Sequence, residues 1–224
     1  MAEMPDTVIR EQIAAGSEAL GATLAGGQLD RLARLVALLA KWNRAYNLTA
    51  VVTPQEMVTH HILDSLAILP WLRGDTLLDV GTGAGLPALV LAIARPRLAV
   101  TGLDAVDKKL RFVRQAAIEL GLENIHAEHA RVEQYRPDRP FAMVVSRAVG
   151  RLAELYGLTR RLLAPGGCWL FMKGRCPEAE LAELAQRVQG PSARVERLEV
   201  PGLGAERHLI ILEHIQVQDA RGSD

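Results

Sequence analysis

Apolar residues recur at spacings of three and four over positions 29–42, at Leu29, Leu32, Leu35, Leu39 and Trp42. This spacing places them along one face of a helix. A second helix is expected over residues 55–69, because Pro54 stands at a position that suits a helix start. The pattern predicts that residues 1–70 form an N-terminal helical extension that packs on the rest of the chain.

The pattern changes after residue 75, where short apolar runs alternate with longer segments of helical period. The runs are TLLDV (76–80), LAVTGLD (98–104), NIHAEHA (124–130), FAMVVSRA (141–148) and CWLFMK (168–173). Runs that are apolar on both faces are typical of a parallel sheet covered by helices. Two further runs, 193–200 and 206–215, flank the segment PGLGA and predict an antiparallel hairpin. Residues 71–224 are therefore predicted to form one α/β domain with a mostly parallel sheet.

Composition narrows the setting in which the chain works. Its 224 residues include only two cysteines, Cys168 and Cys176, which form no disulfide framework and fit a reducing compartment. The N-terminus is too polar for a secretory signal, and no apolar run is long enough for a membrane span. We therefore expect a cytoplasmic protein with no membrane partner. The formal net charge is zero, so a polyanionic partner would have to bind a local basic patch.

The most informative stretch is DVGTGAGLPALVLAIA, which places Gly81, Gly83 and Gly85 between a predicted strand and a predicted helix. Glycine permits positive φ and lets main-chain N–H groups approach a ligand, although a simple tight turn would use the same residues. A phosphate-binding Walker loop needs Gly-Lys-Ser/Thr, which is absent. A dinucleotide loop needs a further glycine for close helix packing, and Leu86 stands at that position.

An acid follows at the end of the next strand. Asp104 lies 21 residues beyond Gly83, where a carboxylate can accept hydrogen bonds from both ribose hydroxyls. Asp104 could instead cap the following helix. Loop and acid together indicate an adenosine-type ligand without a diphosphate, which S-adenosylmethionine matches. After the third strand, the Val132 N–H or Glu133 could hold the adenine edge, unless Glu133 is simply a surface acid.

Arg147 ends the fourth predicted strand, where an arginine needs a partner. A structural ion pair would satisfy it, and so would a contact with substrate or cofactor. No general base is evident, and methyl transfer from a sulfonium needs little acid–base help, so Arg147 is the one candidate for a catalytic, positioning role. The histidines form no ligand cluster with further residues, and we expect no metal site.

Five segments occur in an order that resembles a known family. They are WNRAYNLTA (42–50), HHILDS (60–65), DVGTGAGLPALVLAI (79–93), VSRA (145–148) and MKG (172–174). They are similar to the small-subunit ribosomal RNA methyltransferase G family, also called glucose-inhibited division protein B. The resemblance implies a Rossmann-like S-adenosylmethionine-dependent methyltransferase fold and methylation of ring nitrogen seven of one guanine in 16S ribosomal RNA.

The resemblance also implies site residues. Cofactor contacts fall on Gly81, Leu86, Val132, Glu133 and Arg147, and Asp104 matches the ribose acid. The roles of His60, Asp64 and Ser65 in the HHILDS segment stay open.

The RNA or small ribosomal subunit must meet polar and basic side chains. Asn47 and Thr49 are candidates beside the helical extension, and Lys173 and Arg175 follow the fifth strand. Two other functions fit parts of the sequence. The glycine loop with Asp104 would also suit a nicotinamide-dependent oxidoreductase, and the fold could serve a non-catalytic ribosome-associated binding protein.

Overall fold

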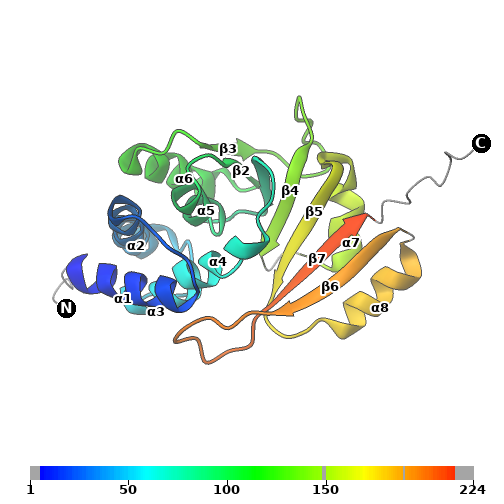
Figure 1. Cartoon of the computed structure of the whole chain (residues 1–224). Helices are drawn as coiled ribbons and strands as arrows, with labels where there is room; N and C mark the ends of the chain where they lie inside the picture. The colour runs from blue at the N-terminus through cyan, green and yellow to red at the C-terminus, as the bar shows by residue number, and fades with distance from the viewer. Residues whose placement is uncertain (1–5, 148–149, 189, 215–224) are drawn as a thin grey trace, which may run out of the picture.

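Figure 1 shows the computed structural model of the chain, which describes residues 6–147, 150–188 and 190–214. Residues 1–5 of the predicted helical extension, Ala148 of the predicted fourth strand and the terminal segment 215–224 lie outside the described residues. The α-helices are α1 (Asp6–Ala19), α2 (Gly26–Tyr46), α3 (Pro54–Met57), α4 (Asp64–Leu66), α5 (Ala88–Ala94), α6 (Asp107–Leu120), α7 (Leu152–Thr159) and α8 (Glu178–Arg187). The strands are β1 (Thr76–Val80), β2 (Ala99–Asp104), β3 (Ile125–His129), β4 (Phe141–Arg147), β5 (Leu163–Lys173), β6 (Pro191–Arg197) and β7 (His208–His214).

The strands form one seven-stranded sheet in the order β3-β2-β1-β4-β5-β7-β6. Pairing is parallel from β3 through β5, and β7 runs antiparallel to both β5 and β6. The predicted parallel sheet and C-terminal hairpin are thus confirmed. The winding direction reverses between β1 and β4, because β2 and β3 lie on one side of β1 and the later strands lie on the other. Open α/β sheets bind their ligands beyond the carboxyl ends of the strands at such a switch point.

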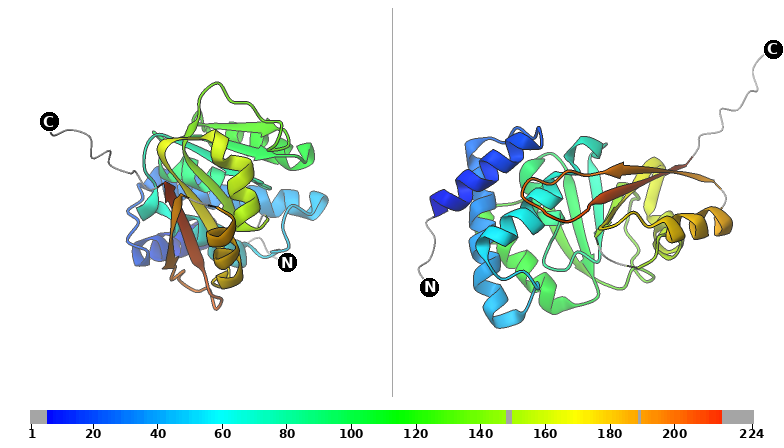
Figure 2. Two further views of the ribbon diagram at one scale, coloured as in Figure 1. Left: turned by 90° about the vertical axis from the view of Figure 1, so that its right-hand side faces the viewer. Right: turned by 90° about the horizontal axis from the view of Figure 1, so that it is seen from below.

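Two apolar cores flank the sheet. The larger core joins one face of the sheet to α1, α2, α5, α6 and the segment 57–69, and it includes the fully buried Phe112. The second core lies on the opposite face under α7 and α8, around Trp169 (Figures 1 and 2). Trp42 connects α2 to α6 within the larger core, because its ring meets that of Phe112 edge-on at 5.7 Å. Among the described residues, no helix has the length and apolar character to cross a membrane.

The helix expected over residues 55–69 is interrupted. It begins at α3, where the Thr53 hydroxyl accepts a hydrogen bond from the Glu56 N–H, and it continues as a π-helical segment, η1 (Val58–Leu63). Helix α4 and a 3₁₀ turn, η2 (Leu69–Trp71), follow. Apolar spacing does not reveal the π turns, because η1 and α4 are buried almost throughout and present no polar face.

The hairpin connection is longer than the segment PGLGA. Strand β6 ends at Arg197 and β7 begins at His208, so residues 198–207 connect them. Leu198 and Val200 leave the ladder because they are buried in the larger core, and a Cβ on Gly202 would lie 3.7 Å from the Thr59 hydroxyl. The connection therefore folds back against the helical extension, as the orange loop in Figure 1 shows.

Candidate functional site

The glycine turn joins β1 to α5 at the switch point of the sheet. Gly81, Gly83 and Gly85 have φ values of 71°, 58° and 76°, so the expected positive φ is confirmed. The N–H groups of Gly81 and Thr82, however, donate to the Leu103 carbonyl. The expectation that this turn offers bare N–H groups to a ligand is wrong for these amides, because the neighbouring strand already occupies them.

The second half of the turn is closed in the same way. The N–H groups of Gly85 and Leu86 both donate to the Thr82 carbonyl, at 2.9 and 3.1 Å. Leu86 is also buried, which leaves little of this residue to contact a cofactor. The turn therefore supplies shape rather than donors. A shape of this kind suits a ligand that is not a phosphate.

Gly83 and Gly85 are glycines for different reasons. A Cβ on Gly85 would lie 2.5 Å from Leu89 Cδ1 and 3.2 Å from Val113 Cγ2, so the absence of a side chain lets the turn pack against α5 and α6. A Cβ on Gly83 would meet nothing closer than the Gly81 carbonyl oxygen at 4.0 Å. Gly85 thus has the packing function that a dinucleotide loop gives to a glycine at position 86. Gly83 faces open space.

Asp104 holds the turn against β2. One carboxylate oxygen accepts a 2.9 Å hydrogen bond from the Gly83 N–H, and the other accepts a 2.8 Å bond from the Val106 N–H. Helix α6 begins at Asp107 with Val106 as its N-cap, so the alternative that Asp104 caps this helix is wrong. The carboxylate is instead fixed beside the open side of Gly83.

A second acid, Asp79, was not singled out from the sequence. Its side chain is fully buried, and one oxygen accepts hydrogen bonds from the Thr82 hydroxyl at 2.7 Å and the Ala88 N–H at 3.2 Å. The other oxygen has no hydrogen-bond partner in the described part of the chain. Burial raises the pKa of Asp79 to about 6. The available signal was an acid inside the apolar run TLLDV, directly before the glycines.

Val132 and Glu133 lie next to the strand end that carries Asp104. The Ala130 N–H donates to the Asp104 carbonyl, which brings the segment after β3 against β2. The carbonyls of Val132 and Glu133 accept hydrogen bonds from Arg161 at 2.5 Å and Arg136 at 2.7 Å. The Glu133 side chain is exposed. Fixed carbonyls hold this segment in place along one side of the switch point.

Arg147 meets an acid from the helical extension. Its Nη1 lies 3.3 Å from Asp64 Oδ2 and donates to the His60 carbonyl at 3.1 Å. The other oxygen of Asp64 pairs with Arg207 Nε at 2.9 Å. Of the two alternatives for Arg147, the ion pair is therefore present. Arg207 was missed, although an arginine directly before a buried apolar strand was a usable signal.

The two segments of the helical extension that carry the resemblance bind each other. The Thr49 hydroxyl lies 2.8 Å from His61 Nε2, and the Thr49 N–H donates to Asn43 Oδ1. Burial, and next the charge of Arg147, lower the pKa of His61 to about 4. His61 is therefore neutral at pH 7. The Thr49 hydroxyl faces inward, where it also accepts a hydrogen bond from the Val51 N–H.

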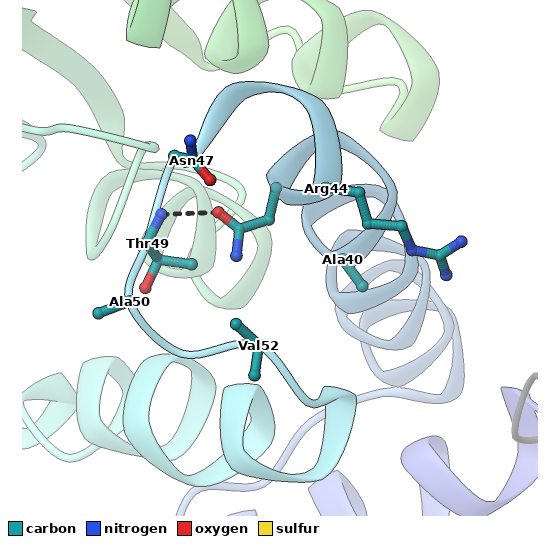
Figure 3. Close-up of a pocket in the computed structure, with 7 residues that line it drawn as sticks. Ala40, Arg44, Asn47, Thr49, Ala50 and Val52 are labelled. Carbon is teal, nitrogen blue, oxygen red and sulfur yellow. Dashed lines mark hydrogen bonds between the residues drawn. The ribbon is translucent and has the colours of Figure 1, made fainter. Parts of the chain in front are cut away.

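A surface pocket of about 480 Å³ lies at the end of α2, lined by Ala40, Asn43, Arg44, Asn47, Thr49, Ala50 and Val52. Asn47 ends the helix with φ 49°, and its side chain is exposed. Figure 3 shows Asn47, Thr49 and Ala50 on the segment that leaves α2, while the Arg44 guanidinium points away from the pocket. Asn47 is thus open to a partner, whereas Thr49 is mostly engaged within the fold.

The two candidates at the end of β5 differ: Lys173 is the last residue of the strand and does not follow it, whereas Arg175 lies beyond it. Lys173 Nζ lies 3.0 Å from Glu180 Oε2 and 3.0 Å from the Gly150 carbonyl, and its side chain is 14% exposed. This geometry does not favour Lys173 as a phosphate contact, because its charge is already paired. Arg175 is exposed and has no ion pair with any described residue. Across residues 6–147, 150–188 and 190–214 no cluster of three metal-ligating side chains occurs.

Solved methyltransferases share this architecture. The glycopeptide N-methyltransferase MtfA, solved with S-adenosyl-L-methionine, matches with a TM-score of 0.58 and 14% identity over 69% of this chain and 87% of its own. A methyltransferase from Pyrococcus furiosus matches with a TM-score of 0.57 and 19% identity over 82% of this chain and 98% of its own. At these identities the likeness shows the fold, which confirms the predicted Rossmann-like methyltransferase architecture.

Sequence relatives are much closer. The protein of Methylobacillus flagellatus named ribosomal RNA small subunit methyltransferase G is 48% identical over 204 residues, 91% of this chain and 98% of that protein. The protein of the same name from Chromohalobacter salexigens is 54% identical over 200 residues, 88% of this chain and 94% of that protein. The sequence profile of the family described as rRNA small subunit methyltransferase G matches residues 28–210. The chain therefore belongs to the rRNA small subunit methyltransferase G family.

Proposed function

We propose that the protein transfers a methyl group from S-adenosylmethionine to ring nitrogen seven of a guanine in 16S ribosomal RNA of the small ribosomal subunit. The observation that carries this proposal is the pair of acids, Asp79 and Asp104, that flank the glycine turn at the carboxyl ends of β1 and β2. A ribosomal RNA substrate implies that the protein works in the cytoplasm with the ribosomes.

The residues around the turn fit this methyl donor. The carboxylate of Asp104 can accept hydrogen bonds from both ribose hydroxyls. Gly83 leaves open space beside it, and the unpartnered oxygen of Asp79 is an acceptor directly under the turn. Val132 and Glu133 would hold the adenine edge from the neighbouring strand end. A turn whose amides are occupied also suits a sulfonium, because a cation gains nothing from N–H donors.

The proposed chemistry requires no general base at the switch point. When bound, the donor supplies an already activated methyl group, and nitrogen seven of guanine carries a lone pair and no proton. The residues of this chain therefore have to hold the two reactants in line, which is a positioning task. Arginine commonly binds guanine through the oxygen and nitrogen seven together. Arg147 must avoid that arrangement, because it would cover the reacting atom.

The RNA would approach from the open side of the switch point. Asn47, at the end of α2, and Arg175, beyond β5, are the exposed candidates for contacts with the RNA. Thr49 would act through the position of the segment that it anchors. Lys173 would support the strand end through its ion pair with Glu180.

The test is methyl transfer by the purified protein from isotopically labelled donor. Protein-stripped 16S RNA and intact small subunits are offered in parallel, and the modified guanine is mapped by chemical cleavage at methylated nitrogen seven. One labelled guanine is expected, and the preferred substrate tells whether RNA or particle is recognised. Tight binding of NADH without binding of S-adenosylmethionine would favour the oxidoreductase alternative. Donor binding without transfer to either substrate would favour a non-catalytic ribosome-associated protein.

A further inference from the structure

One buried carboxylate joins three distant parts of the chain. Asp64 belongs to the helical extension and is 2% exposed, Arg147 ends β4, and Arg207 stands directly before β7. Each oxygen of Asp64 meets one guanidinium, at 3.3 Å to Arg147 and 2.9 Å to Arg207. Both arginines are thereby held on the same carboxylate, at the edge of the sheet where the parallel strands β4 and β5 end.

The charges in this cluster do not balance. One carboxylate cannot neutralise two guanidiniums, and the other hydrogen bonds that hold these arginines go to uncharged carbonyls, those of His60 and Glu206. His61, which follows His60 in the chain, is neutral at pH 7 and adds no charge to the cluster. The side chains of Arg147 and Arg207 are still 21% and 23% exposed. Within this cluster the guanidiniums outnumber the carboxylate, and a further acid, Asp79, is fully buried and feels the charge of Arg147. The partly exposed guanidiniums of Arg147 and Arg207 therefore remain available to a further anion.

We propose that Asp64 is a positioning residue for methyl transfer: it aims Arg147 and Arg207 so that their outer N–H groups bind an oxyanion of the reactants. This inference rests on the proposed function, because the two oxyanions on offer there are a phosphate of the RNA and the carboxylate of the methyl donor. Guanidinium groups bind both, through the same pairs of N–H donors.

A purely structural role for the Asp64 ion pairs would lead to different experimental results. A buried ion pair contributes little net stability compared with an apolar pair, because desolvation offsets the attraction, but removal of one partner is destabilising because it leaves the other charge uncompensated. A purely structural Asp64 would affect unfolding and activity together. A positioning Asp64 would weaken the binding of RNA or donor in protein that remains folded, and a glutamate at the same place would restore part of the loss.

The first experiment compares Asp64→Asn, Asp64→Glu and the wild type. Steady-state methyl transfer gives kcat and KM for RNA, calorimetry with S-adenosylhomocysteine gives donor-site affinity, and urea unfolding reports the fold. Asp64→Asn is expected to lower kcat/KM by at least about tenfold, since each lost contact is a charge-assisted hydrogen bond. Asp64→Glu is expected to recover part of it. Asp30→Asn is the matched control, because Asp30 also pairs with an arginine but lies exposed on α2.

The same kinetic and calorimetric measurements distinguish an RNA phosphate from the carboxylate of the donor as the bound oxyanion. A raised KM for RNA with unchanged affinity for S-adenosylhomocysteine identifies an RNA phosphate, and the reverse pattern identifies the donor carboxylate. A loss confined to kcat contradicts oxyanion binding. Wild-type protein that transfers no methyl group would overturn the proposed function, whereas active wild type with an equally active Asp64→Asn variant would overturn this inference alone.

A double-mutant cycle tests whether Asp64 acts through the arginines. If it does, Asp64→Asn should weaken RNA or donor binding far less in an Arg147→Gln, Arg207→Gln background than in the wild type, because the groups it aims are gone. Binding is measured without turnover, so low activity of the combined variant does not obscure the result. Equal losses in both backgrounds would contradict a positioning role, as would loss of stability that glutamate does not restore.

Discussion

The Gly83 N–H donates a 2.9 Å hydrogen bond to the carboxylate of Asp104, which ties the glycine turn after β1 to the end of β2. The second carboxylate oxygen of Asp104 accepts a hydrogen bond from the Val106 N–H, and the carboxylate lies beside the open side of Gly83. The acid that would hold the ribose is therefore the same group that fixes the turn beside it.

Asp104→Asn should weaken donor binding without unfolding the protein. An amide has one acceptor oxygen instead of two and no charge, so a ribose hydroxyl and the Gly83 N–H would compete for it. Loss of a hydrogen bond to a charged group corresponds to about 10- to 100-fold in affinity. Calorimetric titration with S-adenosylhomocysteine measures this loss.

The control for this substitution is Asp75→Asn. Asp75 is exposed and stands just before the amino end of β1, at the opposite edge of the sheet from the proposed site. Its replacement should leave the donor affinity unchanged. Equal affinities for the Asp104 variant and the wild type would remove Asp104 from the donor site.

Alanine at Gly85 and alanine at Gly83 should have separable effects. Gly85→Ala places a Cβ 2.5 Å from Leu89 and keeps φ at 76°, so overpacking and backbone strain should cost at least about 2 kcal/mol of unfolding free energy. Gly83→Ala has room for the Cβ, and only the strain of its φ of 58° remains, about 1 kcal/mol.

Relative to the stability that each variant loses, Gly83→Ala should lose more donor affinity than Gly85→Ala. The Cβ of Gly83→Ala enters the space beside Asp104, so affinity for S-adenosylhomocysteine should fall strongly in a protein that is still folded. Urea unfolding and calorimetry on the same samples give both quantities. A Gly83→Ala variant with wild-type affinity would show that the open space beside this glycine is not the donor site.

The pairing of Gly83 with Asp104 could be foreseen, because both follow neighbouring parallel strands whose carboxyl ends meet at one edge. The occupied amides of the turn could not. The acceptor for the Gly81 and Thr82 N–H groups is the Leu103 carbonyl on the adjacent strand β2, and the sequence of the turn itself does not indicate this contact. The same holds for Asp64 and Arg207, which are 143 residues apart. Their contact depends on how the hairpin connection folds back on the helical extension, which neither apolar spacing nor a strand motif specifies.

Asp79 and His61 should change the stability of the protein in opposite directions over one pH range. Burial raises the pKa of Asp79 from 3.8 to about 6, so its contribution to stability is present below pH 4 and is lost as the pH rises toward 6. Burial lowers the pKa of His61 from 6.5 to about 4, so its contribution is present above pH 6.5 and is lost as the pH falls toward 4. Each shift corresponds to about 3 kcal/mol, and in the wild type the two slopes oppose each other.

Replacing either residue alone should reveal the pH dependence of the unfolding free energy that the other residue causes. Asp79→Asn leaves the histidine, so its unfolding free energy should fall as the pH is lowered from about 6.5 to 4. His61→Gln leaves the acid, so its unfolding free energy should fall as the pH is raised from about 4 to 6. Urea unfolding across this range measures both, with the exposed His126→Gln as control. Two variants with the wild-type profile would contradict the opposed contributions of these groups.

Arg175→Gln should weaken RNA binding and leave donor binding intact. Arg175 is exposed just beyond β5 and has no ion pair with a described residue, so its charge is available to a phosphate. One phosphate contact contributes about 0.7 to 0.9 to the slope of log affinity against log salt. The variant should therefore bind RNA more weakly at low salt and show a slope that is smaller by about that amount in filter binding.

Lys173→Gln is the matched comparison, because it removes a cation two residues earlier that is already paired. Loss of the contact with Glu180, whose side chain is 25% exposed, should cost about 1 kcal/mol of unfolding free energy. The salt slope of RNA binding should not change, since no counterion is released by a lysine that stays on Glu180. A slope reduced as much by Lys173→Gln as by Arg175→Gln would mean that Lys173 leaves Glu180 when RNA binds. The ion pair seen here would then belong to the free protein alone.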